Sequence, residues 1–139
     1  MSRAATVREH LLTTHADLLD TVLVCADVVA DSWDGDTTPD RAAVVDPFER
    51  RLDRAGVLDR LPAMLAGAID ALGAELTAEP VAAPPYVAIT SVGPVLRATL
   101  DSERLVVTIH AFAVERDPTR YVRGPADPAD ALAVELRSR

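Results

Sequence analysis

Residues 86–115, YVAITSVGPVLRATLDSERLVVTIHAFAVE, decide the fold class of this chain. The segment is rich in β-branched and aliphatic residues and is interrupted by two turn signals, Gly93-Pro94 and Asp101-Ser102. Because the turns are short, consecutive strands are expected to pair antiparallel and to form a meander. The pattern predicts strands over Tyr86–Ser91, Val95–Leu100 and Arg104–Glu115.

The residues after these strands predict one more strand and one helix. Arg120–Arg123 is expected to form a short fourth strand, which extends the meander over residues 86–123. Asp127 precedes Pro128, which places a capping acid ahead of a proline at the first helical position. We therefore expect a short C-terminal helix over residues 127–137.

The sequence before the meander is helical in character. Residues 6–31 predict one long amphipathic helix, because apolar and acidic side chains occupy opposite arcs at helical spacing. A second helix is expected to begin at Asp46-Pro47, with Asp46 as its capping acid, and to stop near Gly56. A third is expected from about residue 62 to residue 77, and its many Ala and Gly residues permit close helix packing.

These patterns predict an α+β fold in a single domain spanning residues 1–139. The helical half, residues 1–77, is joined by a proline-rich connector, residues 78–85, to the meander. We expect the N-terminal helices to pack on one face of an antiparallel sheet of three or four strands. The separation of helical and strand-like halves excludes alternating βαβ units and a doubly wound sheet.

Charge and cysteine content limit the classes of partner. The chain has 139 residues and a net charge of −8, from 22 acidic and 14 basic side chains. Such a charge repels phosphate backbones, so we expect no nucleic-acid partner. No apolar run reaches the roughly 20 residues of a membrane span, so we expect no membrane partner. With Cys25 as the only cysteine and no apolar block in residues 1–20, we expect a reduced, cytoplasmic protein.

The basic residues other than histidine are all arginine, and Lys, Asn and Gln are absent. In this composition the chain resembles the proteins of extremely halophilic archaea. The stretch from Pro84-Pro85-Tyr86 to Tyr121-Val122-Arg123 is also similar to small haloarchaeal proteins. The resemblance implies a salt-rich setting, because the Debye length at molar salt is only about 3 Å and acidic side chains then repel one another weakly. It implies no activity.

Histidines supply the first group of candidate site residues. His15 lies in the apolar arc of the long helix, and His110 lies within the third strand. Together with Tyr86 and Arg97 they are candidates for lining a pocket between the helices and the sheet. The alternative for His15 is a core histidine bonded to one partner. On one continuous helix His10 and His15 point about 140° apart, so their spacing does not favour a metal site.

Arginines near the end of the strand region supply the second group. Arg116, Arg120 and Arg123 cluster there, with Tyr121 among them. Guanidinium groups make two-point contacts with carboxylates and phosphates, so these residues are candidates for binding an anion or an acidic partner. The alternative is that they pair with nearby carboxylates of the same chain.

The sequence carries no motif for catalysis or for a cofactor. It has no G-x-S-x-G elbow, no glycine-rich phosphate loop and no lysine for Schiff-base chemistry. The acids between residues 31 and 40 do not follow the order of an EF-hand loop, so we interpret them as solvated. Cys25 is expected to be a buried apolar residue rather than a catalytic thiol. We expect no cofactor and no metal.

We therefore expect a non-catalytic interaction or regulatory module that self-associates as a homodimer. The Ala- and Gly-rich helix and the open edges of a small sheet both offer surfaces for self-association. An acidic protein or a small anion is the other expected partner. The alternative is a small-ligand-binding protein, or an enzyme, with its pocket between the helices and the sheet.

Overall fold

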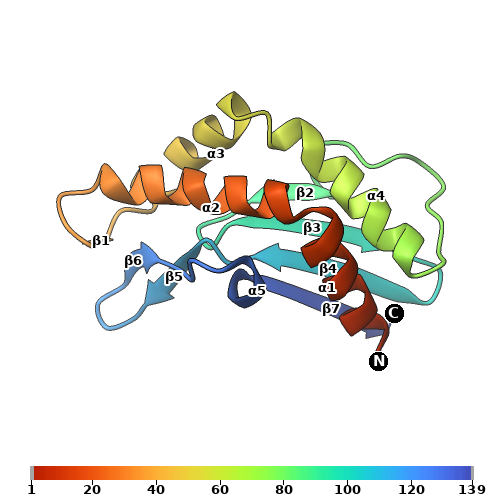
Figure 1. Cartoon of the computed structure of the whole chain (residues 1–139). Coiled ribbons are helices and arrows are strands. Elements are labelled where there is room, and N and C mark those ends of the chain that lie inside the picture. The colour runs from red at the N-terminus through yellow and green to blue at the C-terminus, as the bar shows by residue number, and fades with distance from the viewer. Residues whose placement is uncertain (1, 139) are drawn as a thin grey trace.

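Residues 2–138, which a computed structural model describes, form two antiparallel β-sheets with the four longer α-helices gathered on one side of the larger sheet (Figure 1). The fold is α+β, as the sequence predicts. The helices are α1 (Arg3–Thr14), α2 (Ala16–Asp31), α3 (Val45–Arg54), α4 (Leu61–Ala71) and α5 (Pro128–Ala131). The strands are β1 (Thr37–Thr38), β2 (Val87–Ile89), β3 (Pro94–Thr99), β4 (Glu103–Ile109), β5 (Phe112–Glu115), β6 (Arg120–Arg123) and β7 (Leu132–Ser138). None of the helices in this range is long and apolar enough to cross a bilayer.

The larger sheet has the strand order β2-β3-β4-β7, and its buried face is set by period-two alternation. Leu105, Val107 and Ile109 of β4 are fully buried, whereas the residues between them are more exposed. α4 packs on β3 and α1 packs on β7, so both helices cover this apolar face. Within residues 2–138 no helix covers the opposite face of the sheet, which remains open (Figure 1).

The smaller sheet has the order β1-β6-β5 and divides the predicted meander in two. The strand predicted over residues 104–115 is interrupted at His110 and Ala111, where the chain leaves the larger sheet. The bend is held by backbone hydrogen bonds, because Ala111 N donates to Val92 O (2.8 Å) and Gly124 N donates to Ala111 O (2.9 Å). β1, in the acidic loop, was not predicted.

The predicted single helix over residues 6–31 is wrong, because the structure has two helices that meet at His15. His15 has φ −116° and ψ 27°, and its backbone N–H donates to Leu11 O, which closes the last turn of α1. After this break α1 packs on α4 and β7, whereas α2 packs on α3. The apolar stripe runs unbroken through His15, so local sequence gives no signal of the change in direction.

The predicted C-terminal helix over residues 127–137 is correct at its start and wrong in its length. Asp127 caps α5, since its carboxylate accepts a hydrogen bond from Ala129 N (2.9 Å). The helix ends after one turn, and β7 follows and pairs with β4 from Leu132 to Ser138. Pairing with the free edge of β4 satisfies the backbone hydrogen-bonding groups along a whole strand. A short helix in the same segment is only marginally stable, so the strand is favoured.

Two other helix boundaries differ from the prediction. α3 begins at Val45 rather than after Asp46, and Val44 at its N-terminus makes no side-chain capping bond. α4 ends at Ala71 rather than near residue 77, because Gly73 has a positive φ of 71° that terminates the helix. The predicted stop at Gly56 is confirmed, with φ 75°.

Aromatic side chains join the helical layer to the smaller sheet. Phe112 of β5 contacts Phe48 of α3 edge to face, with ring centroids 5.1 Å apart, and it contacts Trp33 at 5.9 Å. The Trp33 indole donates to Ala43 O at 3.0 Å. Phe48 and Phe112 are almost completely buried, so this cluster is part of one core with the aliphatic residues of the larger sheet.

We predict that Gly93→Ala destabilises the protein by about 3 kcal/mol or more. A Cβ at this position would lie 2.0 Å from Ile109 O, and the φ of 144° is unfavourable for any residue with a side chain. The matched control is Gly35→Ala, where no atom lies within 4 Å of the added carbon and a change within about 0.5 kcal/mol is expected. Urea unfolding followed by circular dichroism measures both; equal midpoints would contradict the steric argument.

Candidate functional site

A cavity of about 480 Å³ lies at the edge of the larger sheet, where the connector passes the ends of β3 and β4. Tyr86 and Arg97, two of the four residues predicted to line a pocket, are both in its wall. The pocket was expected between the helices and the sheet, but arginines from the open face line this cavity. The other lining residues are Leu76, Thr77, Ala78, Pro85, Ala98, Thr99, Arg104, Val106 and Arg137.

Strand register places the polar lining residues on the open face. Leu96 and Ala98 of β3 are buried, so the alternate residues Arg97 and Thr99 face away from the helices. In the antiparallel pairing Arg104 of β4 lies opposite Thr99 on one side and opposite Arg137 of β7 on the other. Three guanidinium groups therefore come from three adjacent strands.

The charge of this group is only partly compensated. Arg137 donates to Glu135 Oε2 through Nε (2.9 Å) and a terminal nitrogen (2.6 Å). Arg97 and Arg104 form no ion pair with any residue from 2 to 138. The cavity is therefore a local positive site on a chain whose net charge is −8.

The described lining residues offer mainly hydrogen-bond donors. Among them the wall has no His, Cys, Asp or Glu side chain. It offers guanidinium groups and the hydroxyls of Tyr86 and Thr99, which donate hydrogen bonds to carboxylate or phosphate oxygens. Across the range 2–138 no three His, Cys, Asp or Glu side chains are grouped as a metal site requires.

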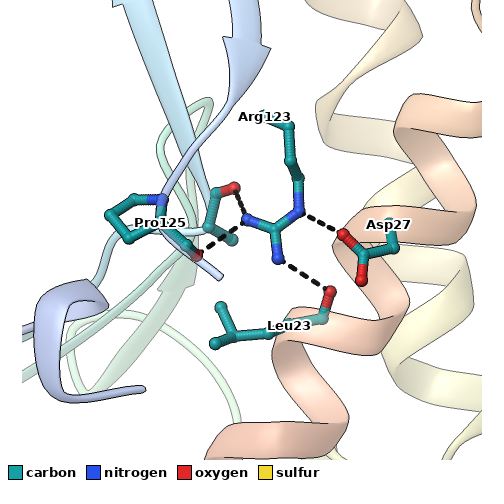
Figure 2. A network of polar contacts seen from close by, with 5 residues as sticks. Leu23, Asp27, Arg123 and Pro125 are labelled. Atoms are coloured by element: carbon teal, nitrogen blue, oxygen red, sulfur yellow. Dashed lines mark hydrogen bonds and ion pairs between the residues drawn. The ribbon is translucent and has the colours of Figure 1, made fainter. Parts of the chain in front are cut away.

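The predicted arginine cluster near the end of the strand region is used largely within the chain. Arg123 is half-buried and joins α2 to the bend: its Nε pairs with Asp27 Oδ1 at 2.7 Å, and a terminal nitrogen donates to Leu23 O at 3.1 Å (Figure 2). Its other terminal nitrogen donates to Ala111 O (2.6 Å) and Pro125 O (3.1 Å).

The other members of that cluster point to different surroundings. Arg120 pairs with Glu115 at 2.6 Å on the surface. Tyr121 is only 8% exposed and belongs to the core. Arg116 is exposed and makes no ion pair within the described part of the chain. These residues therefore do not converge as the cavity arginines do.

His10 and His15 lie side by side, contrary to the prediction from one continuous helix. The break between α1 and α2 brings their rings to 5.9 Å, edge to face. Both rest on Gly67 of α4, where an added Cβ would lie 3.2 Å from His10 Nε2 and 3.4 Å from His15 Nε2. Burial lowers the pKa of His15, and the charges of His10 and Arg60 lower it further. His10 Nε2 is buried and has no hydrogen-bond partner within residues 2–138.

His110 and Cys25 lie elsewhere in the fold. His110 is half-buried at the bend after β4, where its backbone N–H donates to Ala131 O at 2.7 Å. Within residues 2–138 no ring contact or hydrogen bond joins it to His15. Cys25 is buried between α2 and α3, as predicted, and burial raises the pKa of its thiol.

Sequence reasoning missed four polar residues of the cavity: Thr77 in the loop after α4, and Thr99, Arg104 and Arg137 in the strands. Alternation along the predicted strands provides a signal for Thr99, because it lies two residues after Arg97 and so shares its face. Alternation gives a signal for Arg104 as well, because it directly precedes the buried Leu105 and so faces the other side of β4. Arg137 has none, because its segment was assigned to a helix.

Comparison with known proteins gives a family but no function. Residues 5–137 match the family model described as a domain of unknown function (DUF7988). No curated protein matches the chain. No solved structure matches it either.

We predict that Arg123→Ala destabilises the protein by about 2–4 kcal/mol. The substitution removes bonds to three carbonyl oxygens and leaves Asp27 without its cation. Arg120→Ala is the control, because its pair with Glu115 is exposed and is expected to contribute no more than about 0.5 kcal/mol. Thermal and urea unfolding test this, and a similar loss in both variants would refute the role of Arg123.

We predict that stability falls as the pH is lowered through the His15 range. Because the pKa of His15 is lowered in the folded state, the unfolded chain takes up the proton first, below its ordinary value of about 6.5. The contribution of His15 is therefore present above that value and is lost on acidification. His15→Gln is expected to reduce the change in urea midpoint between about pH 7.5 and 5.5. An unchanged pH dependence in this variant would exclude His15 as its source.

Proposed function

We propose that this chain, which belongs to the family described as a domain of unknown function (DUF7988), is a non-catalytic binding module for an anionic group. The binding site is the cavity lined by Arg97, Arg104 and Arg137. The ligand is a carboxylate or a phosphate, carried by a small molecule or by an acidic protein segment.

The observation that carries this proposal is the direct opposition of Arg104 and Arg137 on paired strands. Like charges directly opposite one another destabilise a sheet by up to about 1 kcal/mol, and Glu135 neutralises only one of the two. Arg97 adds a further charge, since its partner Val106 lies two residues from Arg104 on the same face. An anion placed among the three groups would offset their mutual repulsion.

The size and setting of the cavity favour a compact ligand over a polyanion. A volume of about 480 Å³ falls within the usual range of small-ligand sites, roughly 300–1,000 Å³. Residues 1–80 carry 15 acids and 7 arginines, so a long nucleic acid leaving the cavity would meet a negative surface. A single carboxylate or phosphate group avoids that repulsion.

Composition supports the setting of this proposal, and the lining of the cavity supports its regulatory part. The buried thiol of Cys25 and the acidic, lysine-free sequence support a reduced, salt-rich cytoplasm as the place of action. Among the described residues, the lack of His, Cys, Asp and Glu side chains in the cavity wall supports a role in sensing or interaction rather than turnover.

We predict that phosphate or citrate raises the melting temperature of the protein and that Arg97→Gln with Arg104→Gln abolishes the rise. A ligand present at a hundred times its dissociation constant stabilises the folded state by about 2.7 kcal/mol. The measurement is a thermal scan at matched ionic strength, with chloride as the reference anion.

Arg116→Gln provides the matched control, because Arg116 is exposed and has no ion-pair partner within residues 2–138. This variant is expected to keep the full thermal shift. An equal shift in the double variant, or no shift in the original protein with either anion, would refute the proposed site.

A further inference from the structure

The outer surface of α2 exposes two large apolar side chains one helical turn apart. Val24 is 58% exposed and Val28 is 39% exposed. The other exposed large hydrophobic residue in the described range is Val81, in the connector. Two adjacent valines facing water on a helix that otherwise buries its apolar side chains form a small contact patch.

Acidic residues surround this patch on α2. Helical spacing places Asp17, Asp20 and Asp31 within about 40° of Val24 around the helix axis. All three are exposed. They form no ion pair with any residue from 2 to 138. The α2 side of the surface is therefore apolar at its centre and negative around it.

Basic residues lie beside the patch on α3, which packs against α2. Arg50, Arg51 and Arg54 line a groove of about 290 Å³ together with Val28. The three arginines form no ion pair within the described chain, although the acids of α2 are on the neighbouring helix. By helical spacing Asp46, Glu49 and Asp53 of α3 lie on one side of Arg50, and Arg51 and Arg54 lie on the other. The side of α3 that lines the groove is therefore positive, whereas the outer face of α2 is negative.

We propose that this surface, made by Val24, Val28 and the charged residues of α2 and α3, joins two copies of the chain in a symmetric dimer. In a two-fold arrangement each patch contacts the same patch of its partner. If the axis passes near the valines, the acids of each α2 face the arginines of the other copy's α3. The apolar centre is covered, and the unpaired charges of both copies find partners.

The charge pattern favours this surface over the open face of the larger sheet. A two-fold contact through the cavity would bring the arginines of both copies together, which like-charge repulsion opposes. The α2–α3 surface carries both signs and complements itself. It lies on the helical side, away from the open sheet face, so the dimer leaves both cavities accessible (Figure 1).

The first test measures the mass of the full chain by sedimentation velocity over a range of concentrations. The original protein is expected to dimerise, and Val24→Asp with Val28→Asp is expected to raise the dissociation constant about tenfold or more. Val81→Asp is the control, since it places the same charge on a valine of similar exposure outside the surface. A monomeric original protein, or a dimer that survives the double substitution, would overturn the proposal.

A charge exchange separates a lost interface from a lost fold. One variant carries Arg50→Glu with Arg54→Glu, and a second carries Asp17→Arg with Asp20→Arg. Each alone is expected to be folded by circular dichroism and monomeric by sedimentation velocity, because the charges of its surface are then predominantly of one sign. An equimolar mixture is expected to form a heterodimer, with weaker association in molar salt than in dilute buffer. Failure of the two folded variants to associate would contradict the proposed pairing.

Discussion

The fold depends on the close approach of three backbone segments at the bend between the two sheets. A Cβ at Gly93 would lie 2.0 Å from Ile109 O, and one at Gly124 would lie 2.8 Å from His110 O, so both segments pass where no side chain fits. Gly124 N and a terminal nitrogen of Arg123 both donate to Ala111 O, at 2.9 and 2.6 Å. Because Arg123 also holds α2, this bend sets the position of the helical layer relative to both sheets.

Features that depend on neighbouring residues were predictable from the sequence. Alternation and short turns predict the strands, and the cap at Asp127 is present in the structure. The break at His15 and the strand at residues 132–138 were not predictable, because distant partners decide both. The helix direction depends on where β7 and α4 lie, and the last strand depends on a free edge of β4 that no local pattern reveals.

In the candidate site, too, contacts between segments that are close in the chain were predictable, and contacts between distant segments were not. Tyr86 and Arg97 are brought together by a hairpin that the sequence predicts, in which Tyr86 O accepts a hydrogen bond from Arg97 N (2.8 Å). The approach of Arg104 to Arg137 depends on the register between two strands that are not consecutive in the chain. The contact between His10 and His15 has the same origin, because it requires a change in helix direction that Gly67 accommodates. Composition shows that the chain is acidic but not where its positive charges converge.

The order of the strands also affects how the protein is made. β4 lies in the middle of the larger sheet, yet one of its two neighbours, β7, follows every other strand along the chain. While a ribosome is still adding the residues after β6, β4 has one unpaired edge, which is a template for wrong pairing with other chains. The arrival of β7 covers that edge and brings Arg137 beside Arg104. The same folding step therefore covers the free edge of β4 and completes the arginine-lined cavity.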